Sequence, residues 1–368
     1  MVIYFALGIA LIVPVAFLFL LNRFDLYGTG KFFINIITLV CGAGAYYLAA
    51  QINPALINAG WATRSQVIRI AAPILEEILK SIILIILVRR ADFNYIVDGA
   101  LYGFGVGIGF AILENFEYVT GNPQIALTVA VARVFSTNLV HATASGMIGT
   151  ALAYHRGDQT YKAWLAIVLG YLFSISFHMG FNTMVSAGAF LIFAIVFGFV
   201  GVGSIWYVIG RGMNIQKAWV AEKLGMVDRV TKEEMQVVSN INTINEILVP
   251  VEKQFGTHKA SLVRSLVYKQ AEIGIKRKLI EITPSENKKI EIAEIITGLN
   301  KDVDKLRKEI GSYCMLLVRE VYLGNDIQIW SLLNSRVAAA GLGQKGGGLW
   351  DRVNVRVKQS PTQEEDKS

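Results

Sequence analysis

The chain has 368 residues, of which 54% are hydrophobic and 17% are charged, and its mean hydropathy is +0.47. Soluble globular domains carry about 25% charged residues, so this composition excludes an ordinary soluble protein. The formal net charge of +7 fits a basic membrane-facing surface better than nucleic-acid binding, for which basic residues gather on one face. The two cysteines, Cys41 and Cys314, offer neither an evident disulfide nor metal-ligand spacing.

Charged residues divide the chain into two unlike parts. Residues 1–210 contain ten Lys and Arg and eight Asp and Glu, whereas residues 211–368 contain twenty-five and twenty. This split predicts a transmembrane domain over residues 1–210 and a cytoplasmic helical domain over residues 211–337. The remaining stretch, 338–368, is Gly-rich and then highly charged, which predicts a disordered tail.

The first part contains hydrophobic runs that are each near the length of about 20 residues that a bilayer requires. We therefore predict an all-α, polytopic membrane helix bundle of about seven transmembrane helices, followed by a C-terminal helical soluble region. The predicted spans are Val2–Leu21, Phe32–Ile52, Gln66–Val88, Gly99–Tyr118, Gln124–Tyr154, Lys162–Phe181 and Val185–Gly210. The first lacks a basic n-region and an A-x-A-like cleavage site, so we interpret it as a retained helix. The fifth is over-long, which indicates a tilted or projecting helix.

Basic residues in the short loops predict the orientation. The loops after the first, third and fifth spans contain Arg23 and Lys31, then Arg89 and Arg90, then Arg156, whereas the opposite side has Arg64. The positive-inside rule then places the N-terminus outside and the C-terminal region in the cytoplasm of what we expect to be a bacterial cell membrane.

The third span carries three ionisable residues, Glu76, Glu77 and Lys80. Each such residue costs about 2.5–3.5 kcal/mol near a bilayer centre on insertion scales, so a polar interior site is indicated. On a helix Lys80 can reach either glutamate, while the two glutamates point about 100° apart. One of them could face a cavity while the other braces the wall. A buried ion pair that merely locks helices together is the alternative.

The fourth span combines glycines with a further acidic residue. Gly103 and Gly107, like Gly105 and Gly109, form GxxxG patterns, which favour close helix packing over a nucleotide-binding loop. Near the end of the same helix, Glu114 and Asn115 add polar groups at membrane depth.

Two later spans carry polar residues at steps of four, which places each set on one helix face. The fifth span contains Arg133, Thr137, His141 and Ser145, and the sixth contains Ser174, His178 and Asn182. A lone buried histidine is more often structural than catalytic. Two such histidines beside a helix with paired carboxylates favour chemistry. His155 and His258 lie outside these stripes, and we do not expect either to join the site.

These groups suit peptide-bond hydrolysis in a membrane cavity. A glutamate can accept a proton from water, a histidine can share that water or protonate the leaving amine, and His178 with Asn182 can donate to an oxyanion. A zinc site made by Glu76, His141 and His178 is the competing interpretation. Because no HExxH motif is present and Lys80 and Arg133 would repel a cation, the sequence favours a metal-free glutamate mechanism, with a divalent metal such as zinc as the alternative.

Together these motifs resemble the PrsW family of intramembrane proteases. The matching segments are Glu76-Glu77-Ile-Leu-Lys80, Gly109-Phe-Ala-Ile-Leu-Glu114-Asn115-Phe-Glu-Tyr118, Arg133 to His141, and His178-Met-Gly-Phe-Asn182. The resemblance covers about residues 60–185 and extends more distantly to the CAAX prenyl proteases and to a non-catalytic gamma-secretase subunit. It implies site-1 cleavage of a membrane-anchored substrate, such as an anti-sigma factor, in a regulated stress response.

The resemblance also implies site roles. Glu76 or Glu77 would be the base, His141 would help to position the water, and His178 with Asn182 would form the oxyanion hole; Lys80, Glu114, Asn115 and Arg133 would support them. A catalytically silent membrane scaffold and a proton-coupled transporter are the competing functions.

The C-terminal region reads as amphipathic helices. Apolar residues at a/d-like spacing run from Ile292 to Ile310, and Thr283-Pro284-Ser285 marks a break between helices. We expect a small helical domain, which would bind an unknown cytoplasmic partner.

Overall fold

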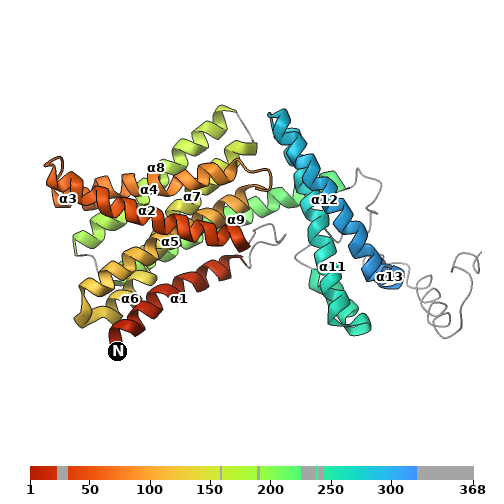
Figure 1. The fold of residues 1–368 in the computed structure, drawn as a ribbon, viewed down its shortest axis with the longest axis horizontal. Coiled ribbons are helices and arrows are strands. Elements are labelled where there is room, and N and C mark those ends of the chain that lie inside the picture. The colour runs from red at the N-terminus through yellow and green to blue at the C-terminus, as the bar shows by residue number, and fades with distance from the viewer. Residues whose placement is uncertain (23–31, 158–159, 189–190, 225–237, 239–243, 321–368) are drawn as a thin grey trace, which may run out of the picture.

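The computed structural model describes residues 1–22, 32–157, 160–188, 191–224, 238 and 244–320. Every regular element among these residues is helical, which confirms the predicted fold class (Figure 1). The helices are α1 Val2–Asn22, α2 Phe32–Asn58, α3 Arg64–Gln66, α4 Ala72–Val88, α5 Ile96–Gly121, α6 Ala126–Val134, α7 Thr137–Gly157, α8 Tyr161–Ser186, α9 Leu191–Leu224, α11 Ile244–Ile282, α12 Glu286–Ile310 and α13 Ser312–Glu320. The predicted tail, 338–368, lies outside the described residues.

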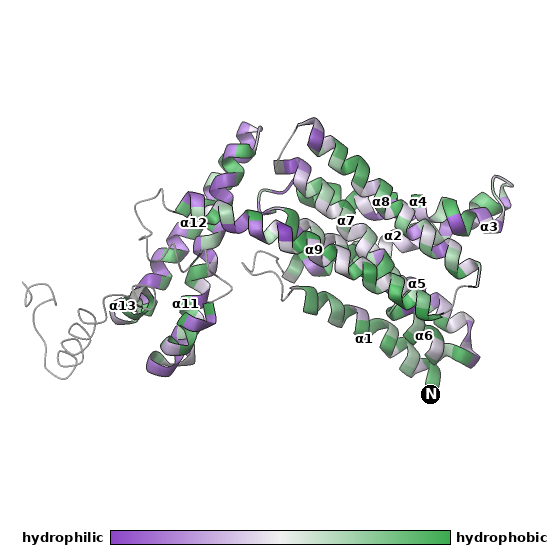
Figure 2. Cartoon of the chain, turned by 180° about the vertical axis from the view of Figure 1, so that it is seen from behind, coloured by the Kyte–Doolittle hydropathy of each residue, from purple (hydrophilic) through white to green (hydrophobic). Residues whose placement is uncertain are grey.

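Six helical segments in the described part of the chain are long and apolar enough to cross a membrane. They are Val2–Leu21, Phe33–Asn58, Ile96–Gly121, Pro123–Arg156, Tyr161–Ser186 and Leu191–Leu224. The remaining predicted span contains α4, which has 17 residues and follows α3 and the π-helical turn Val67–Ala71 without a break. The count of seven is therefore approximate. Hydrophobic residues predominate along the helices of this bundle (Figure 2), and many of the large ones are exposed, as a lipid-facing surface requires.

Helix α5 is the centre of the bundle, since 94% of the most apolar 18-residue stretch of this helix is buried. A Cβ on Gly107 would lie 2.3 Å from the carbonyl oxygen of His141 in α7, and one on Gly109 would lie 2.0 Å from that of Leu39 in α2. Both distances are shorter than any real contact. The predicted role of these glycines in close helix packing is thus confirmed, with α7 against one face of α5 and α2 against another.

The fifth predicted span is not one helix. Helix α6 ends at Val134 and α7 begins at Thr137, so Arg133 and His141 lie on different helices rather than on one polar stripe. The sequence did not reveal this break, because the polar spacing of four continues across it and the two residues between the helices, Phe135 and Ser136, are not strong helix breakers.

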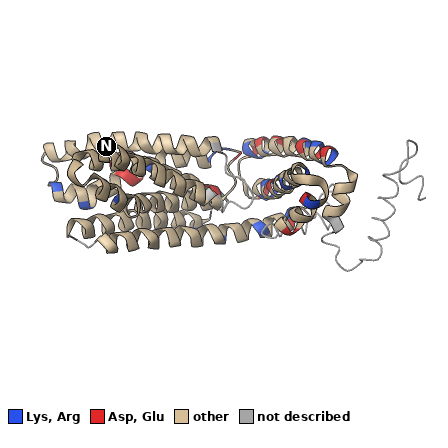
Figure 3. Ribbon diagram, turned by 90° about the horizontal axis from the view of Figure 1, so that it is seen from below, with Lys and Arg blue, Asp and Glu red and all other residues tan. Residues whose placement is uncertain are grey.

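The C-terminal helices form a second, more highly charged body (Figure 3). Helix α9 runs without a break past residue 210, and its last turns pack Val220 and Leu224 into the same apolar core as α11, α12 and α13. The face from Ile292 to Ile310 is buried there, and the predicted break at Thr283–Ser285 separates α11 from α12. These observations confirm the expected C-terminal helical region.

One buried lysine joins the two bodies. Lys276 of α11 is 0% exposed, and its ammonium donates to the carbonyl oxygens of Ala91 at 2.8 Å and Phe93 at 3.4 Å, in the connection between α4 and α5. Burial lowers the pKa of Lys276 to about 8. Lys276 thus fixes the C-terminal helices against one end of the bundle, which is also the end that carries Arg89, Arg90 and Arg156.

Candidate active site

The paired glutamates of α4 have different environments. Glu77 is completely buried and has three partners: Lys80 Nζ at 2.5 Å, His178 Nδ1 at 3.0 Å and Ser145 Oγ at 3.4 Å. Glu76 is 8% exposed, accepts a hydrogen bond of 3.3 Å from Asn53, and lines a cavity. The structure therefore places Glu76 at the cavity and Glu77 in the buried interior behind it, a choice that the sequence leaves open.

The backbone before Glu76 departs from α-helical geometry. In the π-helical turn Val67–Ala71, the amide of Ala72 donates to the carbonyl of Val67, five residues back. Continuing this pattern would pair residue 73 with Ile68, but Pro73 has no N–H to donate. Asn182 of α8 supplies the missing donor, with its Nδ2 3.0 Å from the oxygen of Ile68. Such π-turns often occur at functional sites.

The two predicted histidines meet beside these glutamates. The ring centroids of His141 and His178 are 4.5 Å apart, and both residues are buried. His178 places Nδ1 against Glu77 and Nε2 3.8 Å from a carboxylate oxygen of Glu76. His141 places Nε2 2.9 Å from Glu114 and Nδ1 3.1 Å from the ammonium of Lys80. Each ring is thus oriented by its own carboxylate.

The remaining predicted residues, Asn115 and Arg133, lie next to Glu114. Arg133 Nη2 lies 2.8 Å from Glu114, and Arg133 Nε donates to Asn115 Oδ1 at 2.8 Å. The guanidinium also lies over the ring of Tyr118, 3.8 Å from its centroid. Every buried cation of the site therefore has its own carboxylate: Lys80 is paired with Glu77, and Arg133 with Glu114.

A cavity of about 350 Å³ opens onto this cluster. It is lined by α2, the turn before α4, and the ends of α5 and α8, and among the predicted residues it contacts Glu76, Glu114 and Asn182. Glu76 and His141 lie in the second turns of α4 and α7, and Glu114 and His178 lie about two turns from the ends of α5 and α8. The site is thus roughly 10 Å from the bundle end opposite the C-terminal helices.

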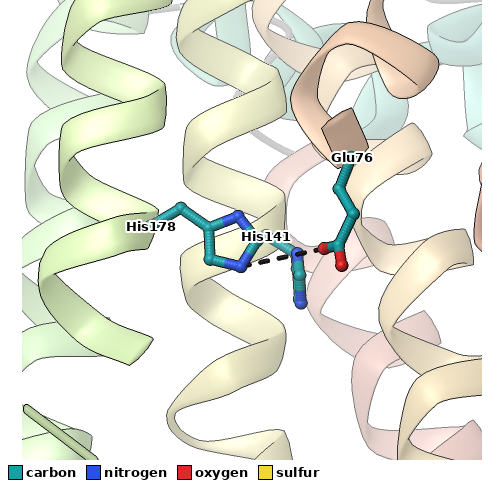
Figure 4. A group of neighbouring side chains, drawn as sticks. All are labelled: Glu76, His141 and His178. Atoms are coloured by element: carbon teal, nitrogen blue, oxygen red, sulfur yellow. Dashed lines mark ion pairs between the residues drawn. The ribbon is translucent and has the colours of Figure 1, made fainter. Parts of the chain in front are cut away.

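The residues present also fit a divalent metal ion. Ligand atoms of Glu76, His141 and His178 lie within 4.8 Å of one another, and all three side chains are buried (Figure 4). Two imidazoles and one carboxylate form a donor set of a catalytic zinc site, and Glu77 and Glu114 supply the second carboxylates that orient such histidines. The repulsion expected from Lys80 and Arg133 is weakened, because both are neutralised by their own glutamates. The preference for a metal-free site is not confirmed.

Sequence reasoning missed two contributors from α2. Asn53 donates to Glu76, and Tyr46 donates to Glu117 at the rim of the cavity. An asparagine directly before Pro54, inside an apolar span, is a signal that could have drawn attention to this helix. Tyr46 offers no such signal, because tyrosine is common in membrane helices.

Fold and site together define a polytopic membrane protein with a buried carboxylate–histidine centre. The chain belongs to the PrsW family, described as intramembrane metalloproteases, whose model matches residues 1–209. It is 26% identical over 172 residues to Protease PrsW of Bacillus subtilis, an alignment that covers 45% of this chain and 61% of that protein. It is 28% identical over 127 residues to Protease PrsW of Shouchella clausii, covering 33% and 56%.

The chain therefore spans about three fifths of the length of these curated relatives. No solved structure matches it.

Proposed function

We propose that this chain is an endopeptidase that hydrolyses a peptide bond in a membrane-anchored protein. The observation that carries this proposal is the convergence of Glu76, His141 and His178 from three helices, with Glu76 at the edge of an accessible cavity. Membership of the PrsW family supports it. The intact cluster argues against a catalytically silent scaffold.

Glu76 is the acidic residue through which the site acts on water. Its carboxylate borders both the cavity and the two imidazoles, so it is placed to hold an attacking water and to accept its proton. Glu77 cannot take this role, because its oxygens are already bonded to Lys80, His178 and Ser145. It keeps His178 oriented instead.

As the alternative form of the site, we propose that Glu76, His141 and His178 hold a divalent metal ion of the zinc class, in which case Glu76 would be a ligand of the ion and not the base. When bound, such an ion would polarise the water and the scissile carbonyl. The chain's own contribution is to orient both rings through Glu77 and Glu114. If Nδ1 of His141 were the ligand, Lys80 would have to move away from that nitrogen, since Nε2 of the ring is held by Glu114.

Asn182 is placed to assist the carbonyl oxygen of the substrate. One hydrogen of its amide is committed to Ile68, and the amide nitrogen carries a second hydrogen on a side chain that lines the cavity. We assign this second hydrogen to the developing oxyanion, in line with the role that the sequence predicts for it.

The substrate is expected to enter from the non-cytoplasmic side. The site lies near the bundle end opposite Arg89, Arg90 and Arg156, and the positive-inside rule makes their end cytoplasmic. Cleavage at this depth corresponds to the site-1 step, and an anti-sigma factor with a single membrane span is the substrate that we propose.

Purified protein in liposomes, mixed with a panel of single-span membrane proteins, tests these assignments. Glu76→Gln and His178→Ala should each lower cleavage by about 10²-fold or more, the usual contribution of a general acid or base. Two exposed residues of the C-terminal helices provide matched controls, Glu294→Gln and His258→Ala, and both should cleave at the wild-type rate. Unchanged cleavage by Glu76→Gln would refute its assigned role.

A chelator separates the two parts of the proposal. Activity lost on chelation and restored by zinc supports the metal site. Activity that survives chelation but is lost in Glu76→Gln contradicts the metal and leaves the glutamate as the acting group.

A further inference from the structure

A second cavity, of about 430 Å³, lies at the opposite end of the bundle from the active site. Its walls are the end of α4, the end of α7, the start of α8 and the turn between α11 and α12. It is therefore formed jointly by the membrane bundle and the C-terminal helices. Neither the proposed peptidase chemistry nor the family motifs use any of its residues.

The cavity has a basic rim. Arg89, Arg156 and Lys288 all line it, and no carboxylate is among the described residues that do so. The carboxylates of Asp92, Asp98 and Glu291 act on these cations from outside the lining. Burial, and then repulsion from Arg156 and Arg89, lower the pKa of Lys288. The three cations thus face one another across a space suited to an anion.

Polar groups of the residues that line the cavity have unused hydrogen-bonding capacity. Arg156 donates through Nη1 to the carbonyls of Val88 and Arg90, at 3.0 and 2.6 Å, but its Nη2 is buried without a partner. His155 Nε2 and Thr283 Oγ1 are likewise buried and unpartnered, and both residues line the same cavity. Buried polar groups normally have partners, so three unused groups around one space indicate a missing oxygen-rich ligand.

The rest of the wall is apolar and faces the bundle. Ile85, Leu152, Ile167 and Tyr171 extend the cavity along α4, α7 and α8, and Trp164 packs edge-on against His155 with centroids 4.4 Å apart. Tryptophan is typical of the membrane–water interface. A free phosphate would leave this apolar wall uncovered, whereas a lipid would place its acyl chain there.

We propose that this cavity binds an anionic phospholipid, with the headgroup phosphate held by Arg156, Lys288 and Arg89 and an acyl chain along α4 and α8. Basic pockets between membrane helices on the cytoplasmic side recognise such headgroups. The bound lipid bridges α4 to the α11–α12 turn, and α4 carries Glu76 at its other end. The lipid therefore connects the C-terminal helices to the helix that presents the catalytic carboxylate.

The test uses the full chain in detergent, titrated with dioleoylphosphatidylglycerol, dioleoylphosphatidylcholine or inorganic phosphate, with thermal unfolding as the readout. Phosphatidylglycerol should raise Tm in a saturable way, and the other two should not. Removing one cation near an anionic headgroup should weaken binding about fivefold. Lys288→Gln should show this loss, whereas Lys289→Gln, which removes the same charge from the next residue, should not, because Lys289 is paired with Glu286.

A second readout locates the lipid. Brominated phosphatidylglycerol should quench tryptophan fluorescence, and Trp164→Phe, which keeps an aromatic ring against His155, should remove part of that quenching. Equal effects of the two phospholipids, or equal losses in Lys288→Gln and Lys289→Gln, would overturn the proposal. A Tm increase with inorganic phosphate but not with phosphatidylglycerol would overturn the lipid assignment and indicate that the cavity binds a soluble phosphate ligand.

Discussion

Neighbouring residues of one helix turn can have opposite tasks in a membrane site. The carboxylate of Glu76 lies at the edge of a cavity. In the next residue, Glu77, both carboxylate oxygens are hydrogen-bonded, to Lys80, His178 and Ser145. A rotation of about 100° between them is enough to separate water chemistry from structural support. In the proposed mechanism, Glu76 of this pair is the reacting group and Glu77 supports it.

The ion pair between Lys80 and Glu77 makes Lys80 important for stability. In Lys80→Met, Glu77 would remain fully buried without its cation, and removing one partner of a buried pair costs about 3–5 kcal/mol. Glu286 and Lys289 have the same i, i+3 spacing on the exposed surface of α12, at 2.7 Å. Lys289→Met should cost at most about 1 kcal/mol. Thermal unfolding of both variants in one detergent measures the difference.

Equal Tm values for Lys80→Met and Lys289→Met would show that Glu77 does not depend on Lys80. A drop confined to Lys80→Met, accompanied by weaker cleavage, is the expected outcome, because His178 is oriented by the same carboxylate.

At this scale the sequence predicted which residues meet, but not how each is used. Charges within apolar spans are costly, so Glu76, Glu77, Lys80, Glu114 and Arg133 had to converge. Which glutamate faces the cavity depends on helix rotation, and rotation is set by packing against α2, α7 and α8 together.

Among the elements, the contact between α5 and α7 holds the site together. His141 belongs to α7, Glu114 belongs to α5, and their contact of 2.9 Å requires the two backbones to approach closely. Glycines on α5 permit this, because a side chain at Gly107 would meet the carbonyl of His141 itself.

Gly107→Ala tests that contact. The new methyl group would lie 2.3 Å from a backbone oxygen, so the helices must separate, at a cost of about 1–3 kcal/mol or more, and His141 must shift away from Glu114. Gly44→Ala on α2 has open space around it and should be neutral or stabilise by about 0.5–1 kcal/mol. Urea or thermal unfolding, together with cleavage rates, would show the contrast. Wild-type stability in Gly107→Ala would contradict the prediction that the α5–α7 contact requires glycine at this position.

The elements themselves were largely predictable, because a bilayer requires long apolar helices and leaves few alternatives. The break between α6 and α7 was not, since Phe135 and Ser136 carry no strong turn signal. The π-helical turn before α4 was also hidden, because it depends on the contact of Asn182 with Ile68, which are far apart in sequence.

For the whole molecule, the two cavities lie at opposite ends of one short helix. Glu76 belongs to the first and Arg89, which directly follows α4, belongs to the second. Lys276 fixes the C-terminal helices next to Arg89 through the carbonyls of Ala91 and Phe93. Helix α4 is thus the direct structural link from the C-terminal helices to Glu76, the carboxylate that we propose to react.

The active-site end of the bundle and the end that carries the C-terminal helices should lie on opposite sides of the membrane. Cysteine labelling can test this topology. Trp61, in the connection between α2 and α3, is 81% exposed near the active-site end, and Asn287 is exposed in the first turn of α12 at the other end. In a chain with Cys41→Ala and Cys314→Ala, a membrane-impermeant maleimide added to intact cells should label Trp61→Cys. It should label Asn287→Cys after permeabilisation and not before. The basic residues Arg89, Arg90 and Arg156 predict this orientation, so the reverse labelling pattern would contradict both the predicted topology and substrate entry from outside.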